Sequence, residues 1–147
     1  MTPPPEPKSI ILSIESRWEN ISLVGVAVQA VCAYVGFSEL DSFQVQLAVV
    51  ESINNVVKHA YGEQSGQEAK VAIKIFPDRI SFQILDTGKT MESMYQEKKE
   101  FSLTTRANLP EGGWGLCIIR TIMDKVTYET VGDTNVLTLD KYLPQAG

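Results

Sequence analysis

The chain of 147 residues has few of the residues that build metal and redox sites, with only two cysteines and one histidine. Cys32 and Cys117 each lie in an apolar, helix-like run, which is typical of buried reduced thiols. No Cys-x-x-Cys motif and no Cys/His metal spacing occurs. Because His59 is the single histidine, we do not expect a zinc site.

The sequence also lacks a cluster of lysine and arginine, and its formal net charge of −5 argues against a nucleic-acid-binding surface. The most apolar stretch, residues 21–35, is interrupted by Gly25 and Gln29 and is too short to span a bilayer. The proline-rich start has neither the basic nor the apolar region of a signal peptide. We therefore expect a cytoplasmic protein with no membrane partner and no direct nucleic-acid partner.

What is present predicts a single globular domain over residues 9–147, after a flexible proline-rich lead over residues 1–8. Alternating apolar residues predict strands, and longer apolar runs with capping residues predict helices. The expected strands are 9–16, 69–75, 79–85, 126–130 and 135–142, and the expected helices are 18–34, from Ser38 or Asp41 to Gly62, and from Gly113 to Met123.

This order predicts an α/β (α+β) two-layer sandwich, in which helices cover one face of a mixed, mostly antiparallel sheet. The helix over 18–34 is expected to be largely buried because its apolar residues are dense. Residues 89–112 show little periodicity, and a connection of this length inside a domain is usually a functional lid or partly disordered.

The stretch over residues 51–61 reads E-S-I-N-N-V-V-K-H-A-Y. On an ideal helix, Glu51, Asn55, Lys58 and His59 share one arc, and the opposite arc is apolar. A carboxylate and an amide one turn apart suit a pocket: Glu51 can orient or deprotonate a nucleophile, and Asn55 offers an oxygen to Mg²⁺. A solvated helix face is the alternative.

Two further motifs lie at the end of a predicted strand and at the start of a predicted helix. Asp86-Thr-Gly88 ends a predicted strand, where a carboxylate can accept from the exocyclic amine of adenine and a glycine lets the backbone approach a flat ring. Gly112, Gly113 and Gly115 open a helix whose amide groups can point at phosphates. No G-x-x-x-x-G-K-[ST] sequence is present, so this is not a P-loop. Each motif alone is weak, but the three together indicate a nucleotide site.

The set of motifs resembles the GHKL superfamily of gyrase, heat-shock chaperone, histidine kinase and MutL-type ATPases. Within it, the short chain is similar to the bacterial partner-switching serine kinases that act as anti-sigma factors. The likeness covers nearly everything after the proline-rich lead. Its matching segments are residues 51–61, residues 86–88 and residues 112–126.

The resemblance implies a role for each matching residue. Glu51 would be the general base or orienting group, Asn55 the Mg²⁺ ligand, and Asp86 the residue that recognises adenine. Gly88 would line the adenine pocket. Gly113 and Gly115 would hold phosphates, and Thr134 would help to bind adenine. The sequence departs from the family pattern in having Asp133 where a glycine is usual before Thr134, and Lys89 near a usual second glycine.

Three residues near these motifs each have two possible roles. His59 is either a phospho-acceptor or a hydrogen-bonded residue near the pocket, and its place inside the nucleotide helix favours the second reading. Arg106 is either a γ-phosphate ligand or a solvated loop residue. Trp114 either covers the pocket or packs.

The resemblance implies a serine/threonine protein kinase that uses ATP and Mg²⁺. It implies a protein antagonist carrying the acceptor serine or threonine, a sigma factor as a sequestered partner, and a homodimer. Glu51 favours this kinase over a nucleotide-binding sequestering module, since a pure binder needs no base. The third reading is an α/β domain without nucleotide.

Overall fold

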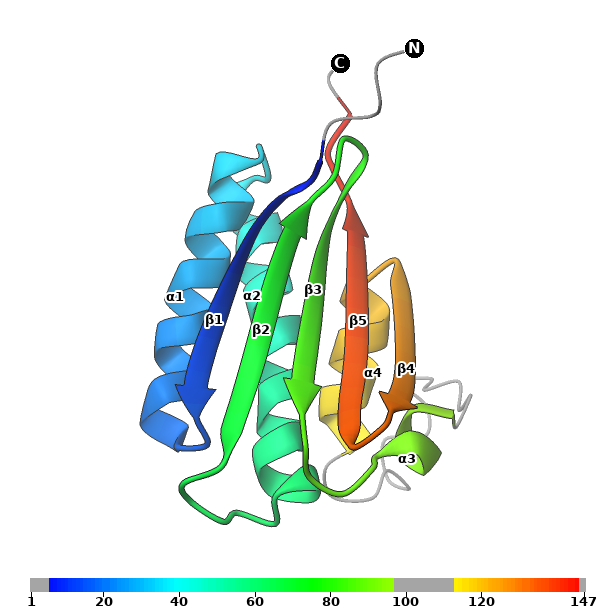
Figure 1. Ribbon diagram of the computed structural model, residues 1–147. Helices are drawn as coiled ribbons and strands as arrows, with labels where there is room; N and C mark the ends of the chain where they lie inside the picture. Colours follow the sequence, from blue (N-terminus) through cyan, green and yellow to red (C-terminus); the bar gives the residue numbers. More distant parts are fainter. Residues whose placement is uncertain (1–5, 97–112, 146–147) are drawn as a thin grey trace.

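The computed structural model describes residues 6–96 and 113–145. It is a two-layer structure in which helices cover one face of a five-stranded sheet of order β1-β2-β3-β5-β4 (Figure 1). The elements in chain order are β1 (Lys8–Glu15), α1 (Trp18–Tyr34), α2 (Glu39–Asn55), η1 (Val56–Ala60), β2 (Glu68–Ile75), β3 (Arg79–Asp86), α3 (Glu92–Gln96), α4 (Gly113–Ile122), β4 (Lys125–Val131) and β5 (Thr134–Tyr142). The expected two-layer sandwich is confirmed.

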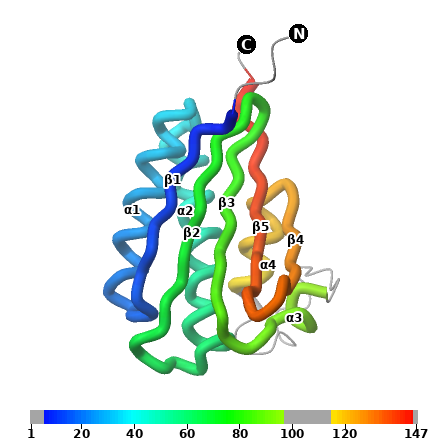
Figure 2. The backbone as a smooth tube through the Cα atoms, in the orientation of Figure 1, coloured from blue at the N-terminus to red at the C-terminus, as the bar shows by residue number. Residues whose placement is uncertain are grey.

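All four strand pairings between the described strands are antiparallel. The connections explain this. Two successive helices, α1 and α2, return the chain to the end of the sheet where β1 stops, so β2 runs back beside β1 (Figure 2). One helix, α4, and one strand, β4, do the same between β3 and β5. The mixed character that we expected is therefore absent among the described strands.

Helix α1 has the bounds that the sequence predicts, and its end has a clear local cause. Gly36 adopts a φ of +102°, a conformation that favours glycine. Its N–H donates to the carbonyl of Ala33, and the N–H of Phe37 donates to the carbonyl of Cys32, which is a Schellman motif. Phe37 and Cys32 are both buried and belong to the hydrophobic core.

The expectation that α1 is largely buried is wrong. Its inner face is buried, but Leu23 is 66% exposed and Val26 is 64% exposed. Dense apolar residues here form two faces, and the sheet covers only one of them. Helix α2 is capped by Ser38, whose side-chain oxygen accepts a hydrogen bond from the N–H of Asp41 at 3.1 Å.

The core lies between the helices and the sheet. Its largest fully buried side chains come from α1, α2 and α4 and from strands β2, β3 and β5. They include Val45, Val49, Ile53, Ile80, Phe82, Ile84, Ile119, Leu137 and Leu139. Within the described residues, no helix has the length and apolarity needed to cross a membrane.

The structure differs from the sequence prediction at the start of two segments, strand β1 and the expected lid. Strand β1 begins one residue earlier than expected, at Lys8, inside the predicted proline-rich lead. The segment expected to be a lid starts as ordered structure, because Met91 and Tyr95 are 4% and 8% exposed and belong to the core. The rest of that segment, including Arg106 and Gly112, lies outside the described residues, as do residues 1–5 of the lead.

Candidate functional site

Four chain segments meet at one end of the molecule. Helix α2 ends there, α4 begins there, β3 ends there, and α3 lies beside β4 (Figure 1). All three sequence motifs are on these segments. The fold therefore gathers residues that are far apart in the sequence, although it does not place every predicted residue in one group.

The first group is formed by Glu51, Asn55 and Gly115. A Cβ atom built on Gly115 would lie 2.8 Å from Oε2 of Glu51 and 3.8 Å from Oδ1 of Asn55. The first turn of α4 therefore faces the carboxylate and the amide oxygen of α2, and a side chain at position 115 would push into the carboxylate of Glu51. This turn also carries N–H groups without a partner inside the helix, which attract anions.

Oxygen atoms of this first group have the chemistry of a Mg²⁺ site. Glu51 offers a carboxylate, and Asn55 offers an amide oxygen while being 7% exposed. Among the described residues, no three His, Cys, Asp or Glu side chains come together as a metal site. A cation at this position would thus depend on one or two protein oxygens together with substrate phosphates, which is how Mg²⁺ is usually held.

The second group surrounds Asp86 at the end of β3. Oδ1 of Asp86 accepts hydrogen bonds from the N–H of Gly88 at 2.9 Å and from Nδ2 of Asn135 at 2.8 Å. Asp86 is 3% exposed. Burial raises the pKa of Asp86, and these two hydrogen bonds lower it in part. Both hydrogen bonds go to Oδ1, so the carboxylate is held in one orientation by one of its two oxygens.

Sequence reasoning missed Asn135. Its Nδ2 also donates to the carbonyl of Gly88 at 2.9 Å, and its Oδ1 accepts from the hydroxyl of Thr130 at 2.8 Å. The signal was available: Leu137 and Leu139 set the inward side of β5, and period-two alternation puts Asn135 on that same side. A buried amide in a row of leucines indicates a hydrogen-bonded polar site.

Thr134 is the residue of β5 that the resemblance assigns to adenine binding. By period-two alternation it lies on the opposite side of the strand from Asn135. It lines a hollow on the uncovered side of the sheet together with Lys70, Leu85 and Thr87, and Asp86 borders the same hollow. Its hydroxyl lies 3.5 Å from the carboxylate of its neighbour Asp133. The structure thus brings Thr134 near Asp86 but on the other face of the sheet from the first group.

Gly88 is required for a reason that differs from the expected one. A Cβ atom at this position would clash with the backbone carbonyl of Ala60 and with the ring of Tyr61. The N–H of Lys89 also donates to the carbonyl of Ala60 at 2.8 Å. The glycine therefore lets the Asp86–Gly88 turn pack directly on Ala60 and Tyr61 at the end of η1.

That end of the helix is not α-helical. After Asn55 the chain makes one π turn, η1, in which the N–H of Tyr61 donates to the carbonyl of Val56. π turns in helices are frequent at functional sites. The turn spans Val56–Ala60, so Lys58 and His59 lie in a π turn and not in the regular α-helix on which we drew their common arc with Asn55.

His59 lies in this π turn, and the pocket that it borders is not lined by Glu51 or Asn55. This surface pocket of about 460 Å³ has Gln64, Gln67, Gly88 and Lys89 among its other lining residues. Desolvation and the charge of Lys58 lower the pKa of His59, which favours the neutral imidazole at neutral pH.

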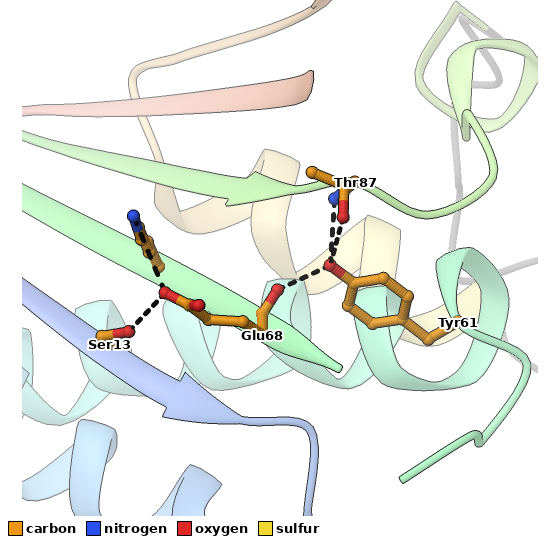
Figure 3. A network of polar contacts seen from close by, with 5 residues as sticks. Ser13, Tyr61, Glu68 and Thr87 are labelled. Carbon is orange, nitrogen blue, oxygen red and sulfur yellow. Dashed lines mark hydrogen bonds and ion pairs between the residues drawn. The ribbon is translucent and has the colours of Figure 1, made fainter. Parts of the chain in front are cut away.

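Tyr61 connects the π turn to the strands (Figure 3). Its hydroxyl donates to the carbonyl of Glu68 at 2.6 Å and accepts from the N–H of Thr87 at 2.9 Å. Glu68 in turn accepts from the hydroxyl of Ser13 at 2.7 Å and pairs with Lys70 at 3.6 Å. The N–H of the middle residue in the Asp86-Thr87-Gly88 turn is therefore fixed by a buried tyrosine from the helix motif.

Gly113 is the first residue of α4, as the motif predicts, and Trp114 follows it in the helix. Arg106 lies outside the described residues, so its proposed contact with a phosphate stays a prediction.

The family model of the histidine kinase-like ATPase domain matches residues 14–141. The chain belongs to this family. The resemblance to GHKL-type ATPases that the motifs indicated is confirmed.

Several curated relatives are serine-protein kinases. The chain is 32% identical to the serine-protein kinase RsbW of Listeria innocua over 139 residues, which cover 91% of this chain and 87% of that protein. It is 29% identical to the RsbW of Halalkalibacterium halodurans over 142 residues, covering 94% and 85%. It is 28% identical to the RsbW of Bacillus velezensis over 138 residues, covering 91% and 85%. The expected similarity to bacterial serine kinases is thus confirmed at the level of the family.

Proposed function

We propose that this protein is an ATP-dependent serine/threonine protein kinase of the partner-switching type. It transfers the γ-phosphate of ATP to a serine or threonine of an antagonist protein. The observation that supports this best is the meeting of Glu51, Asn55 and Gly115, because it puts a carboxylate and an amide oxygen against a helix start suited to phosphates.

Each group of residues has a separate task in this proposal. Asp86, held by Asn135 and Gly88, accepts a hydrogen bond from the exocyclic amine of adenine. The first turn of α4, with Gly113 and Gly115, binds phosphate oxygens. Asn55, with Glu51 beside it, would hold Mg²⁺. When bound, Mg²⁺ supplies charge neutralisation on the phosphate oxygens.

The reaction moves one phosphoryl group and one proton. The hydroxyl oxygen of the acceptor forms a bond to the γ-phosphorus, and the bond from this phosphorus to the β–γ bridging oxygen breaks, which releases ADP. Glu51 takes the proton of the hydroxyl. Phosphoryl transfer depends mainly on positioning and electrostatics, so one base of this kind is sufficient side-chain chemistry.

The test is phosphate transfer from labelled ATP to a candidate antagonist protein encoded nearby, with Glu51→Ala measured alongside. General-base assistance is typically worth about 10²–10⁴ in rate. We expect Glu51→Ala to lose transfer by about this factor while its affinity for ATP stays within a few-fold. If Glu51→Ala loses ATP affinity as severely as Asp86→Asn, Glu51 belongs to the binding pocket and is not the base.

The alternative is a nucleotide-binding module that sequesters a partner without useful kinase activity. Exposed apolar side chains on the outer helices favour a protein-binding role: Leu23 and Val26 on α1, and Leu40 and Phe43 on α2, are 53–66% exposed. The two functions are compatible. A wild-type protein that binds both ATP and its partner but transfers no phosphate would leave only the sequestering role.

The proposed partners are the antagonist and, as the sequestered protein, a sigma factor, which would make the kinase a cytoplasmic regulator of transcription. A homodimer is a further part of the proposal. Pull-down with the antagonist and the sigma factor tests the first two, and light scattering after size-exclusion chromatography tests the third. A monomer that binds neither protein would contradict this assignment.

A further inference from the structure

Tyr95 is held from several sides although it lies in α3, a helix of five residues. Its ring stacks on the ring of Tyr128 in β4, with centroids 4.9 Å apart and an interplanar angle of 16°. Its backbone carbonyl accepts a hydrogen bond from the guanidinium of Arg120 in α4. The side chain is 8% exposed. Tyr95 is therefore placed firmly, and its hydroxyl has a fixed direction.

That direction leads to Asn55. The side-chain nitrogen Nδ2 of Asn55 donates to the hydroxyl oxygen of Tyr95 at 3.4 Å. A phenol is un-ionised at neutral pH, so its oxygen can accept the N–H of the amide.

In this contact the Nδ2 end of the Asn55 amide faces Tyr95. With Nδ2 turned to Tyr95, Oδ1 lies 3.8 Å from the position of a Cβ atom on Gly115, and so faces the first turn of α4 beside Glu51. An asparagine binds Mg²⁺ through its oxygen alone, because its NH₂ group has no lone pair to offer. A flipped amide would present N–H groups to the cation and would repel it.

We propose that Tyr95 is a positioning residue for the metal site: it accepts a hydrogen bond from Nδ2 of Asn55 and so keeps Oδ1 directed at the cation. This inference rests on the proposed function, since it assumes that Asn55 holds Mg²⁺. Partners of metal ligands commonly fix ligand orientation in this way, and their loss typically reduces metal affinity 10–100-fold. Neither the motifs nor the relatives assign a role to Tyr95.

The experiment is calorimetric titration of ATP with Mg²⁺ and with EDTA, and the quantity of interest is the ratio of the two dissociation constants. Tyr95→Phe keeps the ring that stacks on Tyr128 and removes only the hydroxyl. We expect it to reduce the tightening by Mg²⁺ about tenfold, with affinity in EDTA within about twofold of wild type. Asn55→Ala should abolish the tightening.

Tyr128→Phe is the matched control. It makes the same chemical change in the stacked partner, and its hydroxyl accepts from the N–H of Met91 at 2.8 Å instead of from Asn55. We expect this variant to keep the wild-type ratio. If it loses the ratio as Tyr95→Phe does, general loosening of α3 explains the effect and the inference is wrong.

Three other outcomes would overturn the inference. If Tyr95→Phe keeps the wild-type ratio and affinity, the amide of Asn55 needs no such partner. If the ATP affinity of Tyr95→Phe falls equally in Mg²⁺ and in EDTA, Tyr95 is a direct nucleotide contact. If Tyr95→Phe binds ATP more tightly than wild type in EDTA, the hydroxyl competes with the nucleotide. A wild-type protein that binds ATP equally with and without Mg²⁺ removes the metal site itself, which is a failure of the proposed function visible without any change at Tyr95.

Discussion

Asn135 donates a hydrogen bond to the carboxylate of Asp86 at 2.8 Å, and both side chains are nearly fully buried. The pair joins the inward side of β5 to the end of β3. It lies next to the Asp86–Gly88 turn, in which Gly88 packs on Ala60 at the end of η1. Among the described residues, Asp86 has only one other hydrogen-bond donor, the N–H of Gly88, and burying a carboxylate with so few partners is unfavourable for folding alone. Such a group is commonly retained because a ligand needs it.

The first prediction concerns nucleotide affinity. Asp86→Asn preserves the size of the side chain and an oxygen that can accept from Asn135 and Gly88, but it removes the charged acceptor for adenine. Loss of a hydrogen bond to a charged group weakens binding by about 1.5–3 kcal/mol. Calorimetry should therefore show ATP and ADP binding weakened by at least tenfold. Unchanged affinity would remove Asp86 from the site.

The free energy of unfolding of Asp86→Asn should also depend on pH differently from that of the wild-type protein. Burial raises the pKa of Asp86 above its unfolded value of about 3.9. Between the unfolded and the folded pKa, the folded protein holds more protons than the unfolded chain, so the free energy of unfolding falls as pH rises through this window. Asp86→Asn cannot ionise and escapes this loss.

Urea denaturation measured from pH 4 to pH 8 would show this as a difference between the two proteins. We expect Asp86→Asn to gain stability relative to wild type as pH rises from the unfolded pKa through the folded one. Two profiles that stay parallel over the range would mean that the acid is not strained by its burial.

The second prediction concerns Gly115. Alanine there is the better helix former by about 1 kcal/mol, but its Cβ would lie 2.8 Å from Oε2 of Glu51 and displace that carboxylate. We expect stability within about 1 kcal/mol of wild type and phosphate transfer reduced at least tenfold.

Gly25→Ala is a matched control for that change, because a Cβ at Gly25 would also lie 2.8 Å from the end of a flexible polar side chain, Nε2 of Gln46. This contact lies between α1 and α2 and also involves Val50 at 3.3 Å, whereas the Glu51 carboxylate is not among the nearest atoms. Transfer should be retained in Gly25→Ala. Full activity in Gly115→Ala would show that the position of the Glu51 carboxylate does not limit the reaction.

Much of the fold could be predicted because local signals agree with the tertiary structure. Helix α1 ends where Gly36 permits a left-handed residue, and the hairpins follow period-two alternation through Ile80, Phe82 and Ile84 and through Leu137 and Leu139. The π turn over η1 could not be read in the same way. Its apolar residues Val56, Val57 and Ala60 fit an α-helix equally well, and the choice is made by packing against the Gly88 turn.

The site shows the same division. The structure brings Glu51, Asn55 and Gly115 together, as the family motifs imply, while their roles in catalysis stay predictions. The alternation of apolar residues in β5 could have identified Asn135, but the family pattern pointed to its neighbour Thr134 instead. Tyr95 gave no signal, because a residue in a short, aperiodic segment reveals a contact with Asn55 only once the chain is folded.

The last prediction concerns Tyr61, which carries no charge and touches neither proposed phosphate nor proposed metal groups. Tyr61→Phe keeps the ring and removes the hydroxyl that bridges Thr87 N–H and the Glu68 carbonyl. Each lost hydrogen bond typically contributes about 0.5–1.5 kcal/mol, so we expect about 1–3 kcal/mol less stability in urea denaturation.

If the hydroxyl also positions the turn after Asp86, the loss should appear in nucleotide binding under conditions where the variant is fully folded. We expect a several-fold weaker affinity for ATP and for adenosine, since Thr87 lies between Asp86 and Gly88, with the tightening by Mg²⁺ unchanged. Tyr142→Phe, a change at a 59% exposed tyrosine in β5, should alter neither property. A variant that is less stable but binds ATP and adenosine as wild type does would limit Tyr61 to holding the strands, and the turn would then be positioned by Asn135 and by the contact of Gly88 with Ala60 alone.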